Sequence, residues 1–222
     1  MGTVLVIGAS RGIGLEFVRQ SRAAGERVIA TARDDAGLAR LRELGAEVLR
    51  VDVASSASVS GLSWQLDGEK IDLALYAAGV IDRGDALSPP TQAVFDRVLH
   101  TNVLGLMQAL PQVMPMVEDA GGVFAALSSA MSQIGPVPGS NSWLYRASKA
   151  ALNMALRSVR VDYPRARLVA LDPGWVRTDM GGPGAPLDVA TSVAGLRAVL
   201  ASLTPDDNGV LIHHDGRRAT SW

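Results

Sequence analysis

The chain has 222 residues, enough for one large domain or two small ones and for a substantial hydrophobic core. Its 21 basic and 22 acidic residues give a formal net charge of -1, so the composition offers no basic surface for a nucleic acid or an anionic membrane. The absence of cysteine excludes disulfides and thiol chemistry, and three histidines at their spacing are too few for a zinc site. We therefore expect no metal, no nucleic-acid partner and no membrane association.

Short apolar runs rich in β-branched residues alternate with amphipathic segments along the whole chain. Continuous hydrophobic runs are typical of strands that are covered on both faces. The expected strands span residues 3–7, 27–31, 47–51, 71–76, 122–128, 167–171 and 209–213. The expected helices span residues 12–24, 36–44, 55–66, 91–117, 142–162 and 187–202.

This alternation predicts right-handed crossovers and an α/β fold with a doubly wound parallel sheet. We expect one Rossmann domain over residues 1–222, with seven parallel strands and helices on both faces, because no linker or repeat divides the chain. No apolar stretch approaches the ~20 residues that cross a bilayer, and the first eight residues lack the basic start of a signal peptide. The expected location is cytoplasmic.

Three glycines lie at the turn between the first expected strand and the first expected helix. Gly8, Gly12 and Gly14 leave the backbone bare where a helix N-terminus presents unpaired N–H groups. Such a turn favours a pyrophosphate site of the dinucleotide-binding type, although the spacing differs from the G-x-G-x-x-G fingerprint. The alternative is a tight turn without a ligand.

Arginine, not an acid, follows the second expected strand. In dinucleotide folds an acid at this place binds the ribose 2′-hydroxyl, whereas an arginine accommodates a 2′-phosphate. Arg33 stands there and Arg11 lies in the glycine turn, so we expect NADP(H) as the cofactor. Asp34 and Asp35 come after the strand and are interpreted as helix N-caps. The alternative is that both arginines are solvated surface charges.

A tyrosine and a lysine four residues apart mark the expected acid–base site. Tyr145 and Lys149 lie one turn apart on one face of the helix over residues 142–162. A cation near a phenol stabilises the phenolate, so the spacing predicts a general acid–base whose pKa is lowered by Lys149. Upstream, Ser128 and Ser129 end a strand at the sheet edge where ligands bind.

Together these motifs resemble the short-chain dehydrogenase/reductase family, and the match spans nearly the whole chain. A narrower similarity, to the C-factor and sniffer-type carbonyl reductases, comes from residues 145–153 and from the ending 209–222. The family motifs in chain order are Gly8, Gly12 and Gly14, then Ala77 to Gly79, Asn102, Ser129, Tyr145, Lys149, and Pro173 to Asp179.

The resemblance implies roles for individual residues. Tyr145 would donate the proton to the substrate carbonyl, and Ser129 would hold the carbonyl oxygen. Lys149 would contact the nicotinamide ribose, and Asn102 would anchor a water behind the lysine. The cofactor-binding residues implied by the motifs are Gly8, Ser10, Arg11, Gly12, Ile13, Gly14, Arg33, Asp52, Val53, Ala78, Gly79, Tyr145, Lys149, Pro173, Gly174, Val176 and Thr178.

Departures from the family pattern leave alternatives open. Ile7 replaces the threonine that usually precedes the glycine turn, so the bonds that brace this turn must come from elsewhere. Ser129 precedes Tyr145 by 16 residues, a longer gap than in many relatives. Ser128 or Ser132 is therefore an alternative for holding the carbonyl.

The expected function is NADPH-dependent transfer of a hydride between the nicotinamide and a small carbonyl or alcohol substrate. The alternative is a C-factor-like signalling or redox-sensing protein that binds the cofactor with little turnover. Residues 179–186 are too short for a helical lid, which predicts a broad range of substrates; Trp143 and Trp175 either wall the pocket or pack in the core. The long apolar helix over residues 91–117 predicts a homodimer or homotetramer.

Overall fold

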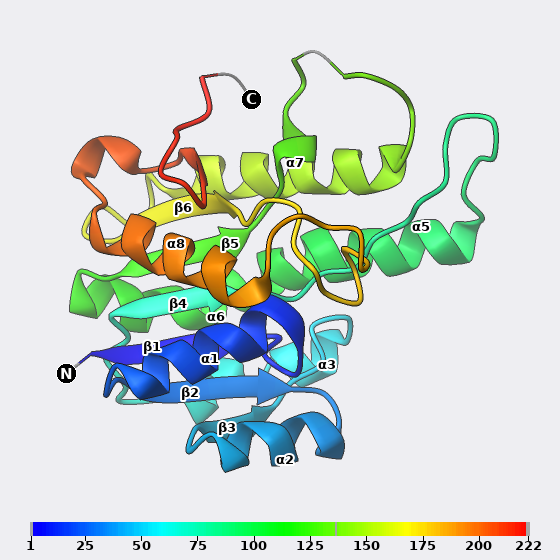
Figure 1. The fold of residues 1–222 in the computed structure, drawn as a ribbon. Helices are drawn as coiled ribbons and strands as arrows, with labels where there is room; N and C mark the ends of the chain where they lie inside the picture. The colour runs from blue at the N-terminus through cyan, green and yellow to red at the C-terminus, as the bar shows by residue number, and fades with distance from the viewer. Residues whose placement is uncertain (1, 136, 221–222) are drawn as a thin grey trace.

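The computed structural model describes residues 2–135 and 137–220. A seven-stranded parallel sheet lies between two layers of helices (Figure 1). The strands are β1 (Thr3–Ile7), β2 (Arg27–Ala32), β3 (Glu47–Arg50), β4 (Leu73–Tyr76), β5 (Val123–Leu127), β6 (Arg167–Asp172) and β7 (Leu211–His213), in the order β3-β2-β1-β4-β5-β6-β7. The prediction of a single-domain, doubly wound Rossmann fold is confirmed. Strand order reverses between β1 and β4, which creates a crevice at their carboxyl ends.

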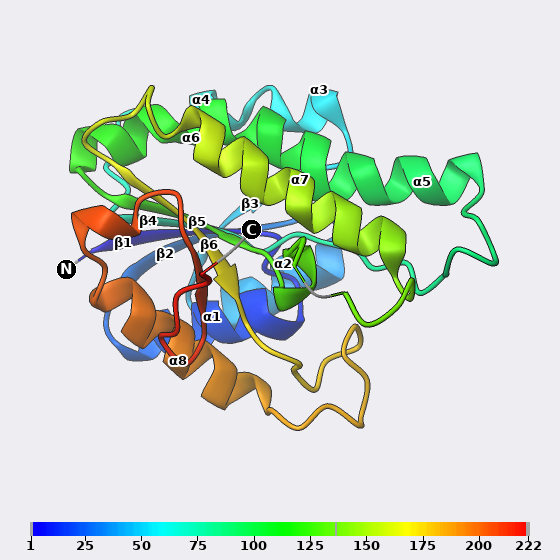
Figure 2. The same cartoon turned by 90° about the horizontal axis from the view of Figure 1, so that it is seen from above.

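Helices cover both faces of the sheet (Figure 2). One layer holds α1 (Gly12–Ala23), α2 (Asp35–Glu43) and α8 (Val189–Ala201). The other holds α3 (Ser56–Val59), α4 (Leu62–Gln65), α5 (Gln92–Leu99), α6 (Gly105–Ala120) and α7 (Trp143–Val159). A π-helix, η1 (His100–Leu104), joins α5 to α6, and short 3-10 turns occur at η2 (Ala130–Ser132) and η3 (Pro205–Asp207).

The hydrophobic core consists of two clusters, one on each side of the sheet. In β5, Phe124 and Ala126 pack toward α6 and α7, whereas Ala125 and Leu127 pack toward α1 and α8. This follows from the alternation of side chains along a strand, and it explains why the strand is apolar at every position. The same alternation decides which side chains beyond each strand face α7.

Two expected helices differ from the observed ones. The segment 55–66 forms α3 and α4, which are separated at Ser60 and Gly61, in place of one helix. The segment 91–117 contains the π-helix η1, which inserts one residue into the helical repeat. The inserted turn brings the side chain of Asn102 against the backbone of Val80, a tertiary contact that helical periodicity does not encode.

Side-chain caps fix several helix starts, and one of them lies where the sequence predicts it. The Asp34 carboxylate accepts a hydrogen bond from the N–H of Gly37 at the start of α2, which confirms its expected capping role. Asp35 instead forms the first turn of that helix. The Asp188 carboxylate caps α8 in the same way through Thr191.

Only some of the apolar side chains of α5 and α6 are buried in the core. Val98 and Leu106 are fully buried, whereas Leu104 and Met107 are 39% and 55% exposed. Assembly with a second copy therefore stays a prediction. In the part of the chain that the structure describes, each helix is too short or too polar to span a membrane.

Candidate active site

The loops that follow β1, β4, β5 and β6 meet at one edge of the sheet (Figure 1). A parallel sheet places all its carboxyl ends together, and the reversal of strand order opens a crevice at that edge. Thr178, beyond β6, lies against Gly12, since a Cβ built on Gly12 would come 3.5 Å from the Thr178 methyl carbon. The loop after β6 therefore closes one side of the glycine turn.

Two glycines of the turn after β1, Gly8 and Gly14, have no room for a side chain. Gly8 has φ +83°, and a Cβ there would come within 2.7 Å of Ala78; a Cβ on Gly14 would come within 2.7 Å of the Gly8 carbonyl oxygen. The N–H of Gly8 donates to Thr31 Oγ1 at 3.0 Å, which supplies the brace that Ile7 cannot. No side chain caps α1, so its first N–H groups face the turn. This cradle fits a pyrophosphate.

Two arginines, Arg11 and Arg40, lie at the glycine turn, and a third, Arg33, follows β2. Arg11 forms an ion pair with Asp179 at 3.2 Å, with both side chains largely exposed. Arg33 is exposed at the end of β2. Arg40 donates from Nε to the carbonyl of Ser10 at 3.1 Å. Arg40 was not predicted for the site, because it lies inside α2 and only the fold brings it to the turn.

Tyr145 and Lys149 are buried on the first turns of α7, with exposed fractions of 7% and 3%. The Lys149 Nζ lies 5.8 Å from the centroid of the Tyr145 ring and donates to the carbonyl of Leu127 at 2.7 Å. A Cβ built on Gly79 would come 3.4 Å from the same Nζ. The predicted pair is thus brought together beside the ends of β4 and β5.

Burial dominates the protonation of both groups. It raises the pKa of Tyr145 to about 12, with the Ser129 hydroxyl bond opposing and the Asp172 charge adding to the rise. Burial lowers the pKa of Lys149 to about 8. The expected lowering of the Tyr145 pKa by Lys149 is therefore not found in the protein alone, because desolvation of the phenolate is the largest effect on that pKa.

Asn102 is fully buried in η1 and joins three parts of the site. Its Oδ1 accepts from the N–H of Val80 at 2.8 Å, and its Nδ2 donates to the Val80 carbonyl at 2.8 Å and to Ser148 Oγ at 2.9 Å. Ser148 in turn donates to the carbonyl of Tyr145 at 2.7 Å. The amide therefore links the loop after β4 to the helix that carries Tyr145.

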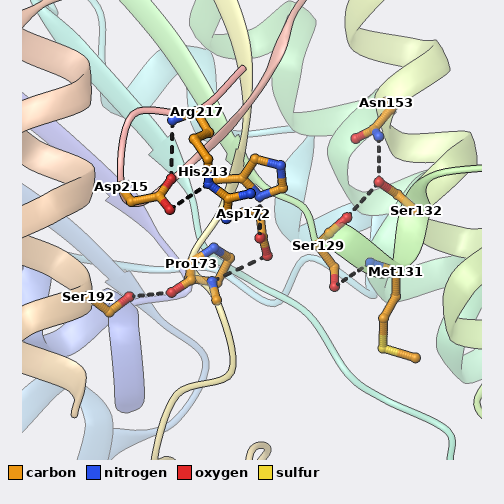
Figure 3. A network of polar contacts seen from close by, with 11 residues as sticks. Ser129, Met131, Ser132, Asn153, Asp172, Pro173, Ser192, His213, Asp215 and Arg217 are labelled. Carbon is orange, nitrogen blue, oxygen red and sulfur yellow. Dashed lines mark hydrogen bonds and ion pairs between the residues drawn. The ribbon is translucent and has the colours of Figure 1, made fainter. Parts of the chain in front are cut away.

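The three candidate serines have different partners, and Figure 3 shows those of Ser129 and Ser132. Ser128 donates to Asn153 Oδ1 at 2.6 Å, and Ser132 accepts from Asn153 Nδ2 at 2.8 Å and donates to the Ser129 carbonyl. Ser129 is the one whose hydroxyl bonds to Tyr145. Asn153 was not predicted for the site, although its place two turns after Tyr145 on the same helix puts it on the same face.

The remaining predicted cofactor residues lie on the loops after β3 and β6. The Asp52 carboxylate accepts from the N–H of Ala54, and Val53 is buried in the core toward α6. Val176 is buried and bridges to Leu187, while Thr178 Oγ1 accepts from Gly181. All of these loops open on the same edge of the sheet.

No helix covers this edge between Thr178 and α8 in the described chain. The loop is held by its own contacts, since Arg177 donates to the carbonyls of Ala185 and Pro186. Trp143 and Trp175 are 39% and 61% exposed, so neither packs in the core. Both tryptophans lie on loops or helix starts at the carboxyl edge.

Comparison with known proteins gives the family. The model of the short chain dehydrogenase family matches residues 2–185, so the chain belongs to this family, whose members are oxidoreductases that use a nicotinamide cofactor. It is 34% identical over 149 residues to the C-signal of Myxococcus xanthus, covering 66% of this chain and 90% of that protein.

Two solved structures resemble the whole chain. The carbonyl reductase Sniffer of D. melanogaster is 26% identical with a TM-score of 0.92, and the alignment covers 100% of both chains. A carbonyl reductase from Pseudomonas aeruginosa PAO1 in complex with NADP is 29% identical with a TM-score of 0.83, also over 100% of both chains. The expected similarity to C-factor and sniffer-type proteins is confirmed.

Proposed function

We propose that the protein is an NADPH-dependent carbonyl reductase in which Tyr145 is the general acid. The observation that carries this proposal is the buried Tyr145, hydrogen-bonded by Ser129 and beside Lys149 at the crevice of the sheet. Bound NADP in a similar structure of a carbonyl reductase supports the choice of cofactor. The same residues serve the reverse oxidation of an alcohol.

Different residues of the site would bind the cofactor, bind the substrate and donate the proton. The first N–H groups of α1, at Gly12 and Gly14, would hold the pyrophosphate, and Gly8 would let it approach the backbone closely. The bound nicotinamide supplies or accepts the hydride. Ser129 holds the substrate oxygen, and the Tyr145 hydroxyl gives its proton to that oxygen. A pKa of about 12 keeps the phenol protonated at neutral pH, so the proton is present for donation.

Lys149 lowers the energy of the phenolate that forms when Tyr145 gives up its proton. With a pKa of about 8, the ammonium is mostly charged at neutral pH and lies 5.8 Å from the ring. Asn102 positions the backbone beside this lysine through Val80. Proton transfer and charge stabilisation are thus separate tasks of two neighbouring side chains on α7.

The preference for NADPH rests on the arginines around the glycine turn. Arg33 is exposed after β2, and Arg40 is held against Ser10. Arg11 is engaged with Asp179, but an exposed ion pair contributes only about 0–1 kcal/mol, so a phosphate competes with it easily. A charge-assisted bond to phosphate is worth more, roughly 1.5–3 kcal/mol.

The open edge favours small hydrophobic ketones, aldehydes or quinones over one particular substrate. Because no helical lid closes over the described loop after β6, few remote contacts are available for discrimination. The exposed Trp143 and Trp175 supply apolar surface at that edge. We also propose a cytoplasmic homodimer or homotetramer, with Leu104 and Met107 at the contact.

A signalling protein that binds the cofactor with little turnover is the second candidate, supported by the 34% identity to the C-signal of Myxococcus xanthus. Consumption of NADPH with a panel of carbonyl compounds separates the two functions. Tyr145→Phe removes the proton donor and is expected to lower turnover by about 10²–10⁴-fold while NADPH still binds.

Tyr163→Phe is the matched control, because this tyrosine is half-buried away from the site and its loss is expected to leave turnover unchanged. Near-normal turnover in Tyr145→Phe contradicts the assignment of the acid. An unmodified protein that binds NADPH but reduces none of the carbonyls supports the signalling function instead.

A further inference from the structure

Polar residues end three neighbouring strands on the side of the sheet that faces α7. The strand registers place Ser128, just after β5, next to Asp172 in β6, and pair Asp172 with His213 in β7. In each strand, the residue two positions earlier belongs to the core cluster beneath α7. Because side chains alternate along a strand, all three polar side chains face the helix that carries Tyr145.

Asp172 and His213 form a buried pair in this row (Figure 3). The His213 Nδ1 lies 2.7 Å from Asp172 Oδ2, and the residues are 9% and 5% exposed. The other carboxylate oxygen of Asp172 accepts from the N–H of Gly174 at 3.2 Å. The reaction proposed above gives neither side chain a task. Burying a carboxylate is costly unless it is paired and hydrogen-bonded, and His213 and the N–H of Gly174 meet that condition for Asp172.

We propose that Asp172, oriented by His213, is a positioning residue that acts through Tyr145 and keeps its hydroxyl protonated, which biases the site toward carbonyl reduction. This inference rests on the proposed function, in which Tyr145 is the proton donor. A carboxylate near a phenol opposes formation of a second negative charge. The site would thus hold its proton ready for donation and resist acting as a base toward an alcohol.

The electrostatic surroundings of the phenol agree with this role. The Asp172 charge is one of the causes that raise the pKa of Tyr145, after burial. The titratable side chains on this face are Lys149 on α7, Asp172 on β6 and His213 at the end of β7, with the ion pair of Asp215 and Arg217 beyond His213 (Figure 3). His214 packs instead against Gly174 and Gly195 of α8. The charge of Lys149 favours the phenolate and that of Asp172 disfavours it, so the two charges act on the pKa of Tyr145 in opposite directions.

A purely structural role for Asp172 predicts a different outcome from an electrostatic one. Asp172→Asn keeps an oxygen for the N–H of Gly174 and places an amide beside His213, but it removes the negative charge. His213→Gln keeps a polar partner for the carboxylate and leaves its charge in place. The first variant therefore tests the charge, and the second is its matched control.

The experiment measures alcohol oxidation by the holoenzyme with NADP⁺ as a function of pH. This direction requires the phenolate, so the rise in kcat reports the ionisation of Tyr145. We expect Asp172→Asn to move this rise to lower pH by up to about one unit, because the Asp172 charge is a smaller cause of the raised pKa than burial. We expect His213→Gln not to move it to lower pH.

A second readout does not require turnover. The ultraviolet absorbance of tyrosinate is titrated in the NADP⁺ complex, with Tyr145→Phe subtracted to isolate this phenol. Asp172→Asn is expected to shift the titration in the same direction, and Asp172→Ser, which is also neutral, serves if the first variant unfolds.

Titrations of the neutral variants that superimpose on that of the unmodified protein overturn the proposal. The same holds for an equal acid shift in His213→Gln, which would show a structural effect of the pair. A shifted titration in a protein that turns over no carbonyl or alcohol supports the role of Asp172 and overturns the proposed enzyme activity.

Discussion

Removal of the Asn102 side chain is expected to destabilise the protein strongly. Asn102→Ala leaves the N–H and the carbonyl of Val80 without the partners that now lie 2.8 Å away, in a place where the amide itself is fully buried. An unsatisfied buried polar group costs roughly 1–3 kcal/mol. Since Val80 is only partly buried, we take the lower part of the range for each of its two groups and expect a loss of about 2–4 kcal/mol in the free energy of unfolding.

Urea and thermal denaturation measure this loss. At this chain length each kcal/mol lowers Tm by about 2–4 °C, so we expect a fall of about 5–15 °C. Asn141→Ala is the matched control, because Asn141 is exposed and such a substitution changes stability by only about 0.5 kcal/mol. Equal stabilities of the two variants would refute the reasoning, since they would show that water replaces the amide at Val80 without cost.

Three further predictions concern charge and assembly. Burial lowers the pKa of Lys149 from 10.5 to about 8, so between pH 8 and pH 10.5 the unfolded chain binds more protons than the folded protein. The free energy of unfolding should therefore rise by about 3 kcal/mol across that window. Denaturation of the protein alone as a function of pH should show this rise in Lys70→Met, the control at an exposed position, and not in Lys149→Met. Arg33→Asp should weaken NADPH binding relative to NADH at least tenfold, and Arg42→Asp, an exposed change on α2, should not; equal affinities of the unmodified protein for the two cofactors would contradict the role of Arg33. Light scattering should show a dimer or tetramer, and Met107→Glu should weaken it because Met107 is 55% exposed; a monomer at micromolar concentration rejects the assembly.

The strands and the order of elements were predictable because their signal is local. Continuous apolar runs such as Val123 to Leu127 are buried on both faces, as the pattern indicates, and Asp34 caps its helix as its position predicts. The break between α3 and α4 and the π-helix η1 were not predictable. The π-helix is accompanied by a contact between Asn102 and Val80, which are 22 residues apart, and helical periodicity carries no record of such a contact.

The site could be predicted only where a motif carries it. The spacing of Tyr145 and Lys149 correctly indicated two side chains that lie together. The pKa of Tyr145 was predicted with the wrong sign, because the sequence reveals a cation four residues away but not how deeply the phenol is buried. The pair formed by Asp172 and His213 depends on the register of β6 and β7, which no local pattern in the sequence specifies.

The π-helix also limits how this protein can tolerate length changes. One inserted residue rotates everything after it by about 100° around the helix axis, because an α-helix has 3.6 residues per turn. α6 is therefore in phase with the sheet only because η1 precedes it, and Val113, Met114 and Val117 are fully buried as a result. Deleting a single residue within 100–104 would regularise the helix and at the same time turn this apolar stripe away from β4 and β5. The irregular turn η1 thus determines which face of α6, the sixteen-residue helix that follows it, packs against the sheet.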